Sequence, residues 1–224
     1  MITKTKKGDF IEIDYTGIIK EENMIFDVTD EKIAKQNNIY HKEHTYRPIT
    51  ICLGKKDVVN GLDNFLIDKE INKEYELEIQ PEDAFGKKQQ ELIKLLPTSV
   101  FTKQNIQPYP GLQVNLNNLI AIIKTVSGGR TLVDFNHPLA GKTLFYRIRI
   151  NKIITDTKER LSSILEQVTK NFNIEIKEKE ATITSDIKDK NMKKELEKEI
   201  KDRIPEISSI IFMDINKEKI STSE

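Results

Sequence analysis

The sequence has 224 residues, of which 37% are hydrophobic and 32% are charged, and its 36 Lys+Arg residues balance 36 Asp+Glu residues. A chain of this size can bury a core in one to three compact units, while its zero net charge argues against a basic nucleic-acid binder and against attraction to acidic membranes. No apolar run approaches the roughly 18 residues of a membrane span, the N-terminus lacks a secretory signal, and one cysteine excludes an internal disulfide, so we expect a cytoplasmic protein.

Residues 1–86 predict a sheet with one short helix. Apolar and polar residues alternate in three segments that we interpret as strands, at residues 9–19, 47–54 and 74–80. Residues 27–47 are polar and show little periodicity, and a short helix entered from Asp57 follows the second strand. Cys52 lies in that strand without a histidine or acid beside it, so we expect a small core residue and not a nucleophile.

The next segment, residues 87–133, is too long for a plain loop and carries its own apolar residues. Its alternation and the turn at 127–129 (Ser-Gly-Gly) predict strands and hairpins, which indicates a small β domain inserted in the first. The turn "NHPLAG", residues 136–141, then returns the chain to a final strand starting at Leu144. A short helix among such strands predicts an α+β domain whose antiparallel sheet wraps around the helix.

Residues 156–224 predict a separate α-β-β-α-β unit. Its first helix is capped by Asp156 or Thr157, its first two strands join near 178–180, and Pro205 ends its second helix. The last strand is apolar on both faces, with Ile210, Ile211, Phe212, Met213 and Ile215. Because an uncovered apolar strand aggregates unless a defined contact covers it, we expect a homodimerisation module. The alternative is that this unit docks on the rest of its own chain.

The three histidines are weak evidence for a metal site. His41 and His44 lie three residues apart, but two such ligands without a nearby cysteine or fixed carboxylate form a weak pattern. His137 precedes a proline, which restricts it to extended geometry, and its imidazole is expected to bond to the backbone of the turn. We therefore predict neither a metal nor another cofactor.

Five short motifs occur in order along the chain: "YTG" at 15–17, "FDV" at 26–28, "LGKKDVVNGLDNFL" at 53–66, "PEDAFG" at 81–86 and "VDFNHPLAGKTLFY" at 133–146. With this order and spacing the chain resembles FK506-binding-protein (FKBP) type peptidyl-prolyl cis-trans isomerases, most closely their long archaeal and SlyD-like branch. The resemblance implies an isomerase domain at 1–86 plus 134–155 and a chaperone domain inserted in its flap at 87–133. Residues 156–224 lie outside it. The wealth of Ile, Lys and Glu fits a thermophilic source or an AT-rich genome.

The resemblance also implies a site for X-Pro bonds. Its catalytic residues would be Tyr15, Asp27 and Tyr146. The substrate-binding residues would be Phe26, Ile49, Val58, Val59, Leu62 and Phe85. In that site the backbone N–H of Val59 would bind a substrate carbonyl, and Leu62 would form the pocket floor. Periodicity alone favours plain core roles for Tyr15, Val58, Leu62 and Tyr146, and a turn role for Asp27.

The reaction implied by the resemblance requires no nucleophile, because rotation about an X-Pro bond breaks only amide resonance, a barrier near ~20 kcal/mol. An apolar cleft removes the water that favours the planar amide. The family often has tyrosine where Phe85 stands and an aromatic floor where Leu62 stands, which implies modest catalysis and weak macrolide binding. The expected partners are unfolded or nascent polypeptides. A holdase that keeps the fold with little catalysis is the alternative function.

Overall fold

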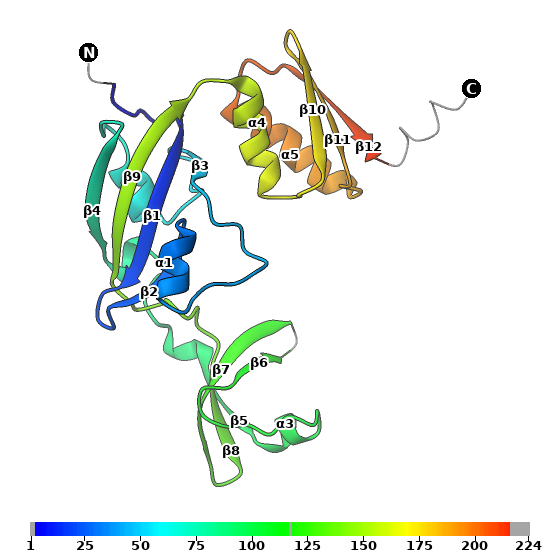
Figure 1. The fold of residues 1–224 in the computed structure, drawn as a ribbon. Helices are drawn as coiled ribbons and strands as arrows, with labels where there is room; N and C mark the ends of the chain where they lie inside the picture. The colour runs from blue at the N-terminus through cyan, green and yellow to red at the C-terminus, as the bar shows by residue number, and fades with distance from the viewer. Residues whose placement is uncertain (1–2, 117, 216–224) are drawn as a thin grey trace. The chain divides into compact units, whose positions relative to one another are not determined.

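The computed structural model describes residues 3–116 and 118–215 (Figure 1). Its strands are β1 Phe10–Ile19, β2 Met24–Val28, β3 Ile49–Cys52, β4 Lys73–Ile79, β5 Ile93–Pro97, β6 Gln113–Leu116, β7 Leu119–Ser127, β8 Arg130–Asp134, β9 Leu144–Ile154, β10 Phe172–Lys177, β11 Glu180–Ser185 and β12 Ser209–Asp214. Its α-helices are α1 Glu31–Gln36, α2 Asn60–Phe65, α3 Ser99–Thr102, α4 Thr157–Glu166 and α5 Lys190–Arg203. These elements form separate sheets, which confirms the α+β class.

The first sheet has five strands in the order β2-β1-β9-β4, with β3 paired to β1. β1 and β3 run antiparallel, with Phe10 opposite Cys52 and Ile13 opposite Ile49. Because alternate residues of a strand point to opposite faces, Ile11 and Ile13 are buried while Glu12 and Asp14 are only partly covered. The alternating segments thus form strands as predicted, and β9 begins at the predicted Leu144 and runs to Ile154.

Two short elements overlap the start of the region, 27–47, that we predicted to be irregular. The strand β2 pairs with β1 at the edge of the sheet. The helix α1 begins at its cap Asp30, whose carboxylate accepts hydrogen bonds from Lys32 N and Ile33 N. Such a cap satisfies N–H groups that the first helical turn leaves without partners. The expectation of an irregular stretch at 27–47 was therefore wrong at its start.

The helix after β3 also begins later than predicted. α2 starts at Asn60 and its N-cap is Val59, so Asp57 does not open the helix. The Asp57 carboxylate instead accepts a hydrogen bond from Cys52 N at 2.8 Å. The turn before α2 contains two residues with positive φ, Gly54 at 81° and Lys56 at 62°. The predicted start at Asp57 was wrong because its side chain is engaged by the preceding strand.

The insert folds around its own sheet, in the order β5-β8-β7-β6. The predicted hairpin joins β7 to β8, where Ser127 pairs with Arg130 across two glycines. Gly128 and Gly129 have φ of 55° and 73°, which glycine adopts without steric cost. Phe101, from the unpredicted helix α3, is fully buried in a core that also contains Ile123 and Val133. The insert therefore has the predicted β architecture with one added helical turn.

The C-terminal unit has the predicted α-β-β-α-β order. β10 and β11 are antiparallel, and β11 and β12 are parallel. Asp156 caps α4 by accepting from Glu159 N, and α5 ends at Arg203, before Pro205. Its core is continuous with the first sheet, because Phe10, Cys52 and Ile154 pack in one cluster with apolar residues of α4, α5 and β11. The unit thus docks on its own chain.

The described residues divide into two compact units: residues 3–17, 27–77 and 146–215 form one, and residues 18–26, 78–116 and 118–145 form the other. The first contains the C-terminal unit together with most of the first sheet, and the second contains the insert. No helix within residues 3–116 and 118–215 is long and apolar enough to span a bilayer.

Candidate active site

The three predicted catalytic side chains come from neighbouring strands of the first sheet. β2, β1 and β9 are adjacent and carry Asp27, Tyr15 and Tyr146 respectively. The Tyr15 hydroxyl donates a hydrogen bond to Asp27 Oδ2 at 2.6 Å. The rings of Tyr15 and Tyr146 are tilted by 55°, with their centroids 6.0 Å apart. Residues separated by more than a hundred positions are therefore brought together by strand order.

Both tyrosine hydroxyls remain protonated. Burial, reinforced by the hydrogen bond to Asp27 and its negative charge, raises the pKa of Tyr15 far above its ordinary value. Burial and then the charge of Asp27 likewise raise the pKa of Tyr146. The other Asp27 oxygen accepts a hydrogen bond from Val28 N at 2.9 Å. This arrangement suits hydroxyl donors oriented by a fixed carboxylate, and it contains no basic tyrosinate.

A threonine that the sequence interpretation missed holds Tyr15 in place. Thr29 Oγ1 accepts from Tyr15 N at 3.0 Å and donates to Asp14 Oδ1 at 2.8 Å. Thr29 N donates to Tyr15 O at 3.0 Å, so Thr29 binds both backbone groups of the tyrosine. Thr29 is buried, and buried polar side chains require such partners. Its position two residues after Asp27 was the signal available in the sequence.

Val58, Val59 and Leu62 belong to α2 and the turn before it. Val59 is the N-cap of α2, and within the described part of the chain its N–H has no hydrogen-bond acceptor. Leu62 is fully buried. The carboxylate of Asp63, also missed from the sequence, accepts from Gly54 N at 2.8 Å and from Lys56 N at 3.0 Å. α2 therefore holds the turn and leaves a backbone donor available at its own start, as helix N-termini do.

The remaining predicted binding residues are half-buried. Ile49 begins β3, opposite Ile13, in the first compact unit. Phe26 and Phe85 belong to the second unit, in which Phe85 stacks face to face on His137 with ring centroids 4.2 Å apart. His137 Nδ1 accepts a hydrogen bond from Leu139 N at 3.2 Å, which confirms the predicted bond to the turn backbone. The sequence interpretation did not anticipate that His137 would support Phe85.

A groove of about 890 Å³ lies along β1, β4 and β9, and it does not coincide with the predicted site. It includes Tyr15 in its lining but neither Asp27, Tyr146 nor Leu62. Acids and bases line it, among them the pairs Arg147–Glu76 and Arg149–Glu74. Because Asp27 and Tyr146 do not line it, we do not assign the groove to the X-Pro site.

The described histidines and cysteine are engaged structurally. His44 packs edge-on against Tyr46, and the Tyr46 hydroxyl accepts a hydrogen bond from His41 N at 3.0 Å. Burial raises the pKa of Cys52 to about 11, so its thiol stays protonated and is a poor nucleophile near neutral pH. Among the residues that the structure describes, no group of three His, Cys, Asp or Glu side chains is placed to hold a metal ion.

Two family models and several curated proteins are similar to this chain. Residues 2–102 match the family model described as FKBP-type peptidyl-prolyl cis-trans isomerase, and residues 94–139 match the model "FKBP26, IF domain". A short-type peptidyl-prolyl cis-trans isomerase of Methanocaldococcus jannaschii is 31% identical over 153 residues, which cover 68% of this chain and 96% of the relative. The FKBP-type isomerase SlyD of Helicobacter pylori is 29% identical, over 55% of this chain and 63% of the relative. The chain therefore belongs to the FKBP-type peptidyl-prolyl cis-trans isomerases.

Proposed function

We propose that Tyr15, Asp27 and Tyr146 form the catalytic part of the isomerase site, and that its substrates are X-Pro bonds of unfolded or nascent polypeptides. The hydrogen bond of 2.6 Å between Tyr15 and Asp27, beside the Tyr146 ring, is the observation that supports this assignment. Apolar surroundings disfavour the planar, polar amide and leave the twisted amide less penalised. The fixed hydroxyls and carboxylate supply a polar edge that is already oriented and needs no reorganisation.

Phe26, Ile49, Val58, Val59, Leu62 and Phe85 complete the proposed site as its binding residues. The Val59 N–H is the backbone donor for a substrate carbonyl, and its lack of an acceptor among the described residues supports that role. Phe85 lacks the hydroxyl that a tyrosine would offer, so one hydrogen bond to substrate is missing. We therefore expect a modest catalytic rate and weak binding of macrolides.

An exchange assay on a short X-Pro peptide tests this function directly. Protease-coupled or NMR measurements with the full chain are expected to show cis/trans exchange that is faster than in buffer. A rate equal to that in buffer would favour the alternative, a holdase that retains the FKBP fold. The hydroxyl–carboxylate pair of Tyr15 and Asp27 favours the catalytic function, because a pure holdase has no use for it.

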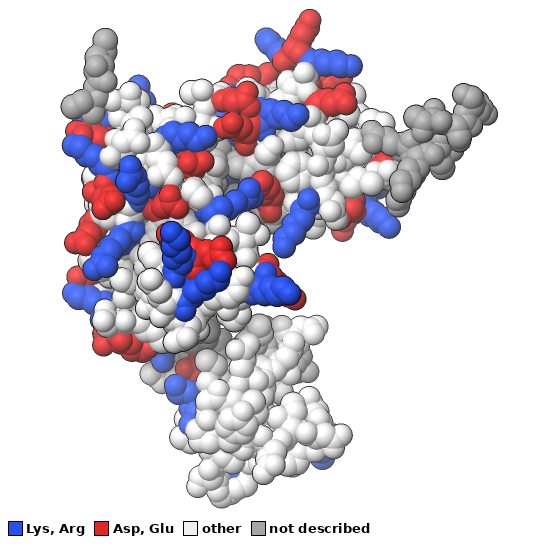
Figure 2. All heavy atoms as spheres, viewed as in Figure 1, with Lys and Arg blue, Asp and Glu red and all other residues white. Residues whose placement is uncertain are grey.

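We propose that the insert binds clients through exposed apolar side chains on its sheet. Leu95, Leu119 and Ile120 are 55%, 60% and 59% exposed, although the insert also fills a core of its own. Figure 2 shows few charged side chains on the visible face of the part that contains β5 to β8 in Figure 1. Exposed apolar area of this kind is typical of a surface that holds unfolded chain. Weak holding raises the local concentration of prolines at the site.

Replacing Leu95, Leu119 and Ile120 together by serine is expected to reduce suppression of client aggregation by about tenfold, because the apolar area available to clients is removed. Isomerisation of a short peptide should stay within about twofold of the wild-type rate, since such a substrate does not need the insert. Light scattering of an aggregating client measures the first effect. The variant Lys103→Ser, which changes an exposed charged residue of the insert, is the control; equal suppression by the triple variant would argue against this surface.

We also propose that the C-terminal unit forms a homodimer through β12. β12 is an edge strand among the described strands, and Ile211, Met213 and Ile215 remain exposed although the opposite face packs into the core. Docking on the same chain therefore leaves this face exposed among residues 3–116 and 118–215. Two-fold pairing is the commonest association of identical chains, and it would cover this strand. A dimer would present two sites to one long unfolded client.

Ile211→Asp is expected to convert the full-length dimer to a monomer, because a carboxylate in an apolar interface costs several kcal/mol of association free energy (~3–5). Sedimentation velocity at micromolar concentration measures the change. Met192→Asp is the matched control, since Met192 is also an exposed apolar residue of the C-terminal unit but belongs to α5 and not to β12. A monomeric wild-type chain, or an Ile211→Asp variant that stays dimeric, would contradict this interface.

A further inference from the structure

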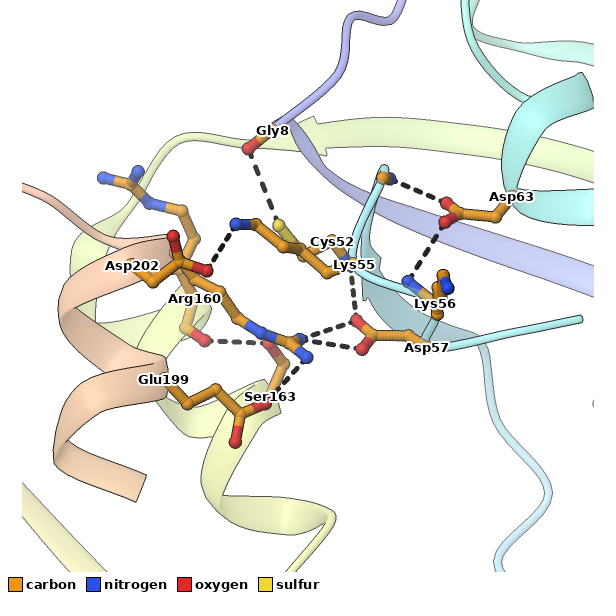
Figure 3. A network of polar contacts seen from close by, with 12 residues as sticks. Gly8, Cys52, Lys55, Lys56, Asp57, Asp63, Arg160, Ser163, Glu199 and Asp202 are labelled. Atoms are coloured by element: carbon orange, nitrogen blue, oxygen red, sulfur yellow. Dashed lines mark hydrogen bonds and ion pairs between the residues drawn. The ribbon is translucent and has the colours of Figure 1, made fainter. Parts of the chain in front are cut away.

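The last turn of α5 contacts the turn that precedes α2. Arg203 Nη1 lies 2.8 Å from Asp57 Oδ1 and 2.9 Å from Asp57 Oδ2 (Figure 3). Arg203 Nη2 also binds Glu199 Oε1 at 2.7 Å, on the preceding turn of α5. The Arg203 side chain is 8% exposed and the Asp57 side chain is 5% exposed, so this ion pair is buried. It connects the C-terminal unit to the isomerase part of the chain.

This ion pair is buried, whereas the ion pairs on the protein surface are exposed to solvent. The neighbouring pair Lys55–Asp202 also joins the turn before α2 to α5, but its Asp202 side chain is 64% exposed. An exposed pair is screened by water and holds little in place. A buried pair is different, because removing one partner leaves the other charge without water or a counter-charge. The positions of the Arg203 and Asp57 side chains therefore depend on each other.

The segment held by this pair leads directly to the proposed substrate-binding residues. Asp57 is followed by Val58 and Val59, and its Oδ2 also accepts the bond from Cys52 N. On the other side of the turn, Asp63 holds Gly54 N and Lys56 N (Figure 3). Lys56 has a left-handed φ of 62°, which a residue with a Cβ keeps only when its surroundings hold it. Two carboxylates thus fix the turn, and Arg203 holds one of them.

We propose that Arg203 is a positioning residue for peptide binding. Through Asp57 it fixes the turn that places the Val59 N–H, so the C-terminal unit completes the isomerase site as well as extending the chain. The inference rests on the proposed role of Val59 in substrate binding. A turn that is ordered before substrate arrives does not lose conformational entropy on binding. Loss of Arg203 therefore weakens substrate binding more than it slows the chemical step.

Arg203→Met in the full-length chain tests this inference. NMR exchange measurements on a short X-Pro peptide are expected to show a KM raised about tenfold and a kcat changed less than threefold. Arg160→Met is the matched control. Arg160 binds Glu206 within the C-terminal unit and lies over the Phe10 ring, but it has no bond to the turn before α2. Its replacement disturbs the same unit and is expected to leave KM within about twofold.

Asp57→Asn and the double variant with Arg203→Met complete the test. In Asp57→Asn the new amide keeps an oxygen that can accept the hydrogen bond from Cys52 N. In the double variant neither charge is buried without its partner, so this variant can be tested even if Arg203→Met alone does not fold. Both are expected to raise KM as much as Arg203→Met does, because all three remove one and the same contact. Equal KM in wild type and Arg203→Met, or effects that multiply in the double variant, would overturn the inference. A wild-type chain that does not catalyse exchange, or whose Val59 amide resonance is unmoved by peptide, would instead refute the proposed site itself and the inference with it.

Discussion

Replacing Asp27 and Tyr146 together by alanine is expected to lower kcat/KM for a short X-Pro peptide by about a hundredfold. The change removes the carboxylate that orients the Tyr15 hydroxyl and the ring that packs beside it. The free energy of unfolding should stay high enough for the variant to remain folded at the assay temperature. The lower rate would then come from the site and not from unfolded protein. NMR exchange rates measure the activity, and urea unfolding of the same samples measures the stability.

Glu12→Ala is the matched control for this double variant. Glu12 lies three residues before Tyr15 on β1 and therefore points to the opposite face, where it accepts a hydrogen bond from Asn151 Nδ2 at 3.3 Å and pairs with Lys152 Nζ at 3.7 Å. Its loss costs polar contacts in which Tyr15, Asp27 and Tyr146 take no part. If Glu12→Ala lowered the rate as much as the double variant, the effect would be one of general stability and the catalytic assignment would be wrong.

Much of the fold could be predicted because most strands have one face on a core. β1, β4 and β9 show the alternation that a half-buried strand requires, and α4 shows an apolar stripe. β2 was missed because "MIFDV" is short and unalternating, and it forms through pairing with β1 at the edge of the sheet. α1 was missed because it is held by its cap Asp30 and buries only Ala34, so its sequence carries no apolar period.

Some residues of the candidate site could likewise be predicted from the sequence, and others could not. Tyr15, Asp27 and Tyr146 were predicted from the resemblance, and strand order explains why they meet. Arg203 could not be predicted, because a contact between residues 146 positions apart leaves no local pattern. In a chain with 36 basic and 36 acidic residues, each charge is far more often solvated than buried. The start of α2 was misplaced for a related reason, since Asp57 has the chemistry of an N-cap but its carboxylate binds Cys52 N and Arg203.

Replacing residues 90–135 by a short Gly-rich link is expected to leave peptide isomerisation within about threefold of wild type. The ends to be joined are already adjacent. Asn136 Oδ1 accepts from Gln89 N at 2.9 Å, Asn136 Nδ2 donates to Gln89 O at 3.0 Å, and Gly141 N donates to Gly86 O at 2.8 Å. A few residues therefore close the gap at little entropic cost. The cut removes β5 to β8 and α3 and keeps Phe85 and His137.

The same deletion is expected to slow catalysis of proline-limited protein refolding by about a hundredfold, because the client is no longer held near the site and its effective concentration falls. Refolding of a protein with a slow proline phase, followed by fluorescence, measures this effect beside the peptide assay. The Leu95, Leu119 and Ile120 serine variant should fall between wild type and the deletion on refolding, and match wild type on the peptide. An equal loss on peptide and protein would mean that the insert shapes the isomerase site itself, and client holding would then not explain its presence.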